Sequence, residues 1–157
     1  MSANTSQQQV KMSPPTLIEM WEADAKFDDT ELDTESFKIP ILHAKYLKIL
    51  SQARLWAKRC HYERRELFAK LRDYYLGNLN GTEELKTMDR PPMLVRHLKN
   101  EVHTHIEADT ELIKQDARIA IAEESCAVAE EILKAINNRG YQIKNAIEWR
   151  KLTQFGQ

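Results

Sequence analysis

The stretch from Ile41 to Tyr75 contains neither proline nor glycine, and this run constrains the fold more than any other part of the chain. One stripe of positions within it recurs in steps of four and three, interrupted only by Glu63. The stripe consists of Leu42, Tyr46, Ile49, Ala53, Trp56, Cys60, Leu67, Lys70 and Tyr74. A period near 3.5 residues is typical of a helix packed lengthwise on another helix. Flanking apolar residues widen the stripe, so we expect more than one partner helix.

The rest of the chain favours the same fold class. Only four glycines and five prolines occur among 157 residues, and good helix formers are abundant. We therefore expect an all-α domain over residues 16–157, with long helices packed as an elongated hairpin or bundle. Residues 1–15 are polar and are expected to form a disordered extension.

Capping residues, prolines and glycines predict where the helices begin and end. Thr16 and Glu19 have the spacing of a capping box that opens a short amphipathic helix. This helix begins an acidic arm over 16–40, which is expected to be irregular or partly extended from Phe27 to Ile39 and to end at Pro40. A glycine commonly follows a helix C-terminus, so Gly77 is expected to close a long basic helix over 41–77. Likewise Gly140 is expected to separate a helical return over 92–139 from a short helix over 141–155. Within the return we expect Met93–His105 to be helical, and Asp109 or Thr110 to cap or kink the segment after it.

The charge is strongly segregated although the net charge is only −1. Residues 1–40 hold three Lys and Arg against eight Asp and Glu, whereas residues 41–75 hold nine against three. The nine cations lie on one predicted helix, so they can form an elongated surface for phosphates.

A row of basic side chains runs along that helix. At about 100° per residue, Arg54, Lys58, His61, Arg65 and Arg72 fall on one side of it, while Lys70 lies in a looser second group. Such a row can track a single nucleic-acid strand, and Tyr75 is the aromatic best placed to stack on a base. Any such binding should be independent of sequence and sensitive to salt. A solvated helix face is the alternative interpretation.

The predicted last helix has apolar residues on two sides. Ile143, Ala146 and Ile147 share one face, and a second apolar set lies broadly opposite. The second set contains Tyr141, Trp149, Leu152 and Phe155. A surface helix needs only one apolar face, so the second set predicts a contact with a neighbouring subunit. The alternative is that a long internal helix covers it within the monomer.

Catalytic and metal-binding patterns are weak. His97, Glu101 and His105 recur every four residues and could offer metal ligands, but a solvated polar face explains them better. The chain has no glycine-rich phosphate loop, and no nucleophile with a matching base can be assembled from a local signature. We expect a protein that is not an enzyme and needs no cofactor or metal.

Equally simple features indicate the location. The first residues lack the apolar core of a signal peptide, and no apolar run approaches the length of a membrane span. Cys60 and Cys126 lie on apolar stripes without a CxxC pattern, which favours a reducing compartment. We expect a cytoplasmic protein that does not bind membranes.

Two motifs resemble the phage recombination mediator family typified by UvsY. The first is Asp-Tyr-Tyr-x-Gly over 73–77, preceded by cations, and the second is Arg-Gly-Tyr-x-Ile-Lys over 139–144. Their order and spacing agree with the family, and the similarity covers roughly residues 17–156. The family pattern Lys-x-Arg-x-Asp-Tyr-Tyr differs here, since Lys70 and Arg72 each stand one place later.

The resemblance implies a mediator that binds single-stranded DNA and works with a strand-exchange recombinase and a single-strand-binding protein. It also implies ring-like homo-oligomers assembled through the C-terminal region, with DNA contacts in the region of Lys70 and Arg72. The host-cell cytoplasm would then be the location. An alternative from a different class is a self-assembling helical scaffold or adaptor that binds only proteins.

Overall fold

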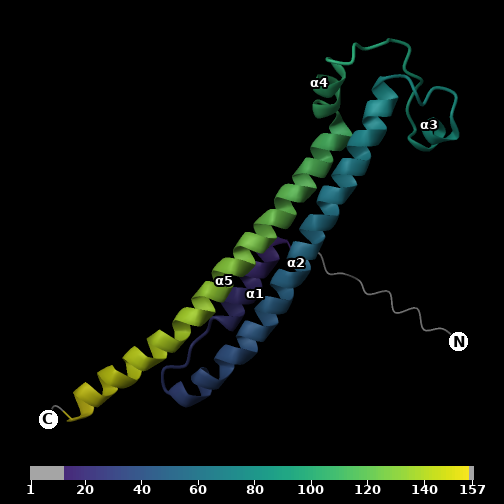
Figure 1. Cartoon of the computed structure of the whole chain (residues 1–157). Coiled ribbons are helices and arrows are strands. Elements are labelled where there is room, and N and C mark those ends of the chain that lie inside the picture. Colours follow the sequence, from purple (N-terminus) through teal and green to yellow (C-terminus); the bar gives the residue numbers. More distant parts are fainter. Residues whose placement is uncertain (1–12, 156–157) are drawn as a thin grey trace, which may run out of the picture. The chain divides into compact units, whose positions relative to one another are not determined.

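The structure, a computed structural model, describes residues 13–155, with side chains as far as Gln154. This part of the chain contains five helices and no strand, as the all-α prediction required. The helices are α1 (Pro14–Asp24), α2 (Leu32–Tyr75), α3 (Glu83–Thr87), α4 (Val102–Glu107) and α5 (Thr110–Phe155), all labelled in Figure 1. The chain divides into two compact units: residues up to Leu55 together with those from Ile121 form the first, and Trp56–Ala120 form the second.

In the first unit, α1 and α5 both cover the apolar stripe of α2. Tyr46 and Ile49 of α2 are buried in one core with Leu17 of α1 and with Ile132 and Ile136 of α5. The Trp21 ring meets the Tyr46 ring edge-on, with centroids 5.7 Å apart. Removing this apolar surface from water is the main force that holds the three segments together. The expectation of more than one partner helix is confirmed.

A buried arginine fastens the end of α1 in this unit. Arg139 of α5 is 4% exposed, and its guanidinium donates hydrogen bonds to the carbonyl oxygens of Asp24, Ala25 and Lys26. These carbonyls lie at the C-terminus of α1, where the helix dipole is negative and backbone acceptors lack intrahelical partners. The same guanidinium lies over the Trp21 ring. Arg139 therefore fixes where α1 ends against α5.

The second unit is built from the end of α2, the start of α5 and the segment between them. Leu71 of α2 packs with Val102 and Ile106 of α4 and with Leu112 of α5. A smaller apolar cluster in this unit places the turn after α2 and the short α3 against the end of α2. The cluster consists of Tyr74, Leu79 and Leu85.

Gly77 ends α2 as predicted. Its φ of +79° is left-handed, a region that glycine adopts without a steric penalty. The Asn78 N–H donates to the Asp73 carbonyl, and the Gly77 N–H donates to the Tyr74 carbonyl. These are the two hydrogen bonds of a Schellman motif, so the glycine satisfies carbonyls that the helix end would leave without partners.

The predicted start of α2 was wrong, because the helix begins at Leu32 and runs through Pro40. An internal proline costs about 3 kcal/mol in lost hydrogen bonding and steric conflict. Burial around it opposes that cost: Leu32 is 7% exposed, and Ile39 packs on the core of the first unit. The acidic residues Asp33 and Glu35 lie in the first turn, where the helix dipole favours negative charge.

The predicted start of α1 was also wrong. The N-cap residue is Ser13, and Pro14 and Pro15 occupy the first helical positions. Proline suits these positions because its φ is already helical and its missing N–H has no partner there. Two residues assigned to the extension thus belong to α1, and residues 1–12 lie outside the described part.

Gly140 does not end a helix, and the division of 92–155 at this residue was wrong. Helix α5 continues from Thr110 to Phe155, because residues on both sides of the glycine, Ile136 and Ile143, are buried. Asp109 caps its start as expected, since its carboxylate accepts the Glu111 N–H at 2.9 Å.

The helix predicted over Met93–His105 forms only from Val102. The Asn80 side chain pairs with both backbone groups of Met93. That pairing holds this segment as a loop.

Two further observations concern the chain as described. Cys60 and Cys126 are free thiols, the first of them buried. Among residues 13–155 no helix is both long enough and apolar enough to cross a membrane.

The two glycines predict opposite effects of the same substitution. At Gly140 an added Cβ would meet nothing within 4 Å, so Gly140→Ala should raise the free energy of unfolding by about 0.5–1 kcal/mol. Gly77→Ala should lower it by about 1 kcal/mol, because alanine is strained at positive φ. Urea unfolding followed by circular dichroism measures both. A destabilising Gly140→Ala would contradict the open helical environment.

Candidate nucleic-acid interface

Ion pairs join α2 and α5 in the second unit, and Arg64 is the α2 cation that takes part in them. The Arg64 guanidinium binds both oxygens of Asp116, at 2.5 and 3.2 Å, and also reaches Glu107. The hydrogen bonds to Asp116 raise the pKa of Arg64. In the reverse sense, Arg118 of α5 pairs with Glu63 of α2 at 3.1 Å. These charges hold the two helices in register and are not available to a ligand.

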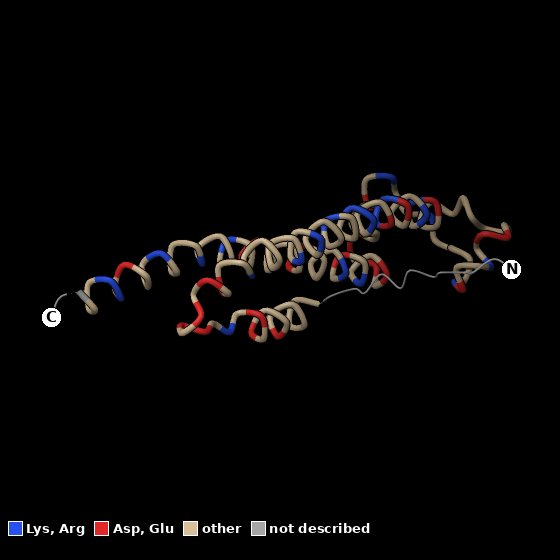
Figure 2. The backbone as a smooth tube through the Cα atoms, turned by 90° about the horizontal axis from the view of Figure 1, so that it is seen from below, with Lys and Arg blue, Asp and Glu red and all other residues tan. Residues whose placement is uncertain are grey.

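Three predicted contact residues lie on the other side of α2 and remain exposed. Lys58, Arg65 and Arg72 recur every seven residues over about 21 Å of helix. None of them forms an ion pair with any residue in the described part of the chain. We call these three residues the basic row. Figure 2 shows Lys and Arg in blue along the chain.

Two other predicted cations differ from the basic row. Lys70 is exposed but lies about 120° around the helix from Lys58. Arg54 belongs to the first unit, where it pairs with Glu130 at 2.7 Å. Both partners of that pair are largely exposed, and such surface pairs contribute little energy, so a phosphate can compete for Arg54.

Tyr62 is an aromatic residue that the sequence reasoning missed. It is 59% exposed, and the Arg65 guanidinium lies 5.7 Å from its ring centroid. Its position, four residues after Lys58 and three before Arg65, places it on the side of α2 that carries the basic row. That spacing alone could have identified it.

Tyr75 is in a different environment from the one predicted. Its hydroxyl donates to the Asp109 carboxylate at 2.8 Å, and its ring stacks on His105 with centroids 5.8 Å apart. His97 meets the ring edge-on. Burial, followed by the hydrogen bond to Asp109, raises the pKa of Tyr75. A ring held in this way is not an open platform for a base, so we do not carry Tyr75 into the proposed interface.

An ion pair between Arg90 and Asp109 holds this region together. The guanidinium binds both carboxylate oxygens, at 2.7 and 2.9 Å, and the two side chains are 15% and 4% exposed. Arg90 also lies over the Tyr74 ring. The hydrogen bonds from Arg90 lower the pKa of Asp109 to about 2. The pair joins the end of α2, the loop after α3 and the start of α5, and no sequence motif indicated it.

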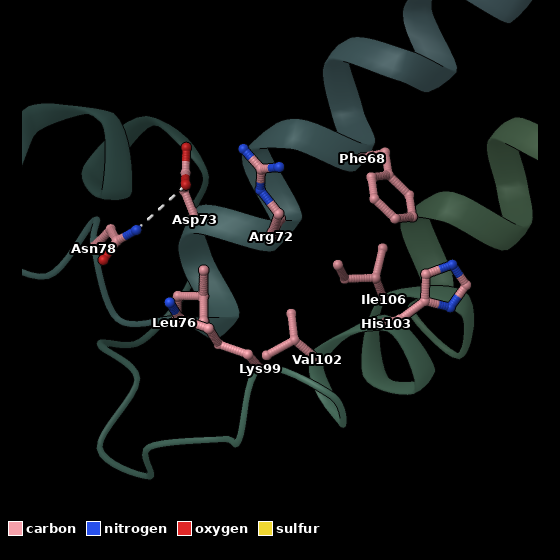
Figure 3. Close-up of a pocket in the computed structure, with 9 residues that line it drawn as sticks. All are labelled: Phe68, Arg72, Asp73, Leu76, Asn78, Lys99, Val102, His103 and Ile106. Atoms are coloured by element: carbon pink, nitrogen blue, oxygen red, sulfur yellow. Dashed lines mark hydrogen bonds between the residues drawn. The ribbon is translucent and has the colours of Figure 1, made fainter.

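An open pocket lies beside the basic row in the second unit (Figure 3). Its volume is about 470 Å³. The lining residues come from the end of α2, the turn after it, the loop before α4, and α4. They are Phe68, Arg72, Asp73, Leu76, Asn78, Lys99, Val102, His103 and Ile106. Arg72 is therefore both the last cation of the basic row and part of the pocket wall.

The second apolar face of the last part of α5 is uncovered in the described structure. Tyr141, Trp149 and Leu152 are 72%, 68% and 70% exposed, whereas Ile143 on the opposite side is buried. We call these three residues the apolar face of α5. The alternative that an internal helix covers them does not hold for residues 13–155. The side chain of Phe155, the fourth predicted member, lies outside the described part.

The described residues include no cluster of three or more His, Cys, Asp or Glu side chains that could hold a metal ion. His97 and His105 do come together, with ring centroids 4.1 Å apart. Glu101 is the exposed N-cap residue of α4. Both histidine rings pack on the Tyr75 ring.

The fold and the charge distribution define an all-helical protein with a long exposed cationic surface. A family model described as "Recombination, repair and ssDNA binding protein UvsY" matches residues 20–156. The chain therefore belongs to the UvsY family. No curated protein matches it in sequence.

Solved structures agree with this assignment. Crystal structures of the bacteriophage T4 recombination mediator protein UvsY are similar to the chain in fold. The lattice type I structure has a TM-score of 0.73 at 26% identity, covering 87% of this chain and 98% of that one. The lattice type IV structure has a TM-score of 0.76 at 24% identity, covering 90% and 99%.

The Arg90–Asp109 pair predicts a specific dependence of stability on pH. A carboxylate with a pKa near 2 in the folded chain and 3.8 as its ordinary value contributes stability above about pH 4, which is lost as the pH falls toward 2. Asp109→Asn should therefore be less stable than the parent by about 2 kcal/mol near pH 7, and the difference should shrink between pH 4 and 2.

Asp89→Asn removes the same charge from an exposed position of the same unit, and asparagine tolerates the positive φ found there. This control should track the parent at every pH in urea unfolding. A gap between Asp109→Asn and the parent that stays constant down to pH 2 would contradict the assigned role of the ion pair.

Proposed function

We propose that this chain is a recombination mediator that binds single-stranded DNA without sequence specificity. In this proposal it helps to load a strand-exchange recombinase onto DNA covered by a single-strand-binding protein. The observation that carries the proposal is the basic row: its cations are exposed and without carboxylate partners in the described chain, whereas Arg54 and Arg64 of the same helix are paired. Membership of the family supports the same ligand.

The physical basis of binding is the neutralisation of phosphates. Each phosphate that a lysine or arginine neutralises releases counterions from the strand, so affinity falls as salt rises. The row offers no arrangement of donors and acceptors for reading base edges, so affinity should vary little with sequence. Tyr62, beside Arg65, adds a ring on which any base can stack.

Assembly completes the proposal. The apolar face of α5 would bind a second copy of the chain, and repetition of such contacts would give a ring-like homo-oligomer. Each copy would add one basic row to the same strand, which raises the overall affinity without any new kind of contact. The protein would act in the cytoplasm of the host cell if a phage encodes it.

The basic row can be tested by its effect on salt dependence. Replacing Lys58, Arg65 and Arg72 together by alanine should lower the slope of log affinity against log salt by about two, since each single-strand phosphate contact contributes about 0.7. Fluorescence anisotropy of a labelled oligonucleotide across a salt series measures the slope. Lys70→Ala should have a smaller effect than Arg72→Ala, because Lys70 lies on another side of the helix.

The matched control removes the same charge elsewhere. Lys86, Lys134 and Lys144 are exposed and pair only with glutamates of their own helices, so their joint replacement should leave the slope unchanged. An equal loss in both triple variants would mean that net charge, not the basic row, determines binding. A row variant that loses assembly but not DNA binding would favour the scaffold alternative.

The assembly role of α5 predicts a change in mass without a change in fold. Trp149→Ala with Leu152→Ala should dissociate the oligomer in light scattering, and the helical content should stay close to that of the parent. Leu94→Ala with Leu98→Ala removes similar exposed apolar surface, 91% and 63% exposed, from the second unit and should leave the mass unchanged. If the α5 variant keeps the parent mass, its apolar face is not the subunit contact.

A further inference from the structure

The pocket beside Arg72 has a composition that a phosphate-binding row does not require. Its inner wall is apolar, formed by Phe68, Leu76, Val102 and Ile106. Phe68 and His103 place two rings on this wall, with centroids 5.7 Å apart. A site that only bound phosphate would need no apolar wall. Moving a phosphate from water to a place without hydrogen-bond donors is unfavourable.

The polar part of the lining is cationic. Arg72 and Lys99 both line the pocket, are exposed, and have no carboxylate partner among the described residues. Asp73 is the one acidic side chain in the lining, and it accepts a hydrogen bond from the Asn78 amide at 3.4 Å. The pocket thus combines an apolar wall with two cations that form no ion pair in the described chain.

That combination suits a ligand with a flat apolar part and an anionic part. We infer that the pocket binds one nucleotide of the single strand, with the base on the Phe68–His103 wall and the adjoining phosphate between Arg72 and Lys99. The inference rests on the proposed function and specifies how the strand is held. A volume of about 470 Å³ lies within the range of small-ligand sites.

Two observations favour a nucleotide over an acidic peptide. Arg72 belongs both to the basic row and to the pocket, so a strand that runs along the row arrives at the pocket opening. The apolar wall includes two rings, which suit the flat face of a base. Stacking on a ring does not depend on the identity of the base, so the pocket should accept any base and add affinity without sequence specificity.

The experiment compares two oligonucleotides of equal length and charge, one of thymidines and one in which every base is absent. The full-length protein should bind the abasic strand at least about fivefold more weakly, because stacking of even one base contributes that much. His103→Ala and Phe68→Leu should reduce this ratio toward one. Thr104→Ala changes an exposed neighbour outside the pocket and should keep the parent ratio.

Charge is tested separately. Lys99→Ala should weaken binding of the thymidine strand, whereas Arg96→Ala should not, because Arg96 is an exposed cation of the same loop that does not line the pocket. Equal affinity of the parent for both strands would overturn the inference while leaving the proposed function intact. An acidic peptide is expected to displace neither strand. A peptide that binds in the pocket without affecting DNA binding would also overturn the inference. Failure to bind either strand would refute the proposed function itself.

Discussion

The apolar stripe of α2 is the constraint on which the rest of the structure depends. A helix that shows this much apolar surface cannot remain in water alone, and its coverage decides the position of every other element. In the first unit α1 and α5 bury Tyr46 and Ile49. In the second unit α4 and the start of α5 cover Leu71, which flanks the stripe, and Leu67 of the stripe packs against the same cluster. Because other helices cover the apolar stripe, the cations of α2 that form no ion pair in the described chain face solvent. The basic row is thus a consequence of how the core is covered.

Two arginines, one in each unit, have the same structural role: each binds acceptors at the end of a helix. Arg139 binds the backbone carbonyls at the end of α1, and Arg90 binds the carboxylate that caps the start of α5. Each also lies over an aromatic ring, Trp21 and Tyr74 respectively. A planar guanidinium can satisfy several acceptors and stack at once, which lysine cannot do. The arginine in the Arg-Gly-Tyr motif therefore has a structural role in this chain, at a helix end rather than at a ligand.

Periodicity predicted the fold class and most of the apolar stripe of α2, although Lys70 of that stripe is exposed. The glycine at position 77 predicted the end of α2. Each of these features depends on local sequence. The failures share one cause. Pro40 and Gly140 are helix breakers by local preference, yet both lie within helices because residues near them, such as Ile39 and Ile136, pack against other segments. The prediction of a helix over Met93–His105 failed in the opposite direction. Its first part is a loop, because the Asn80 side chain pairs with the backbone groups of Met93. Contacts between segments distant in sequence decided all three.

The same limit applies to the site. Arg64 and Arg65 are adjacent in the sequence, and the carboxylates that face α2, Asp116 above all, make the first a structural cation and leave the second available. The position of Tyr75 on α2 predicted a stacking residue, whereas Asp109, His97 and His105 hold its side chain. The exposed Tyr62 was not predicted. A charge pattern can therefore name the helix that binds a polyanion, but the partner helix selects the residues. A relative that kept the cations of α2 but lost Asp116 would leave Arg64 with only its 3.4 Å contact to Glu107, and Arg118–Glu63 would be the remaining ion pair between α2 and α5 among the described residues of this unit.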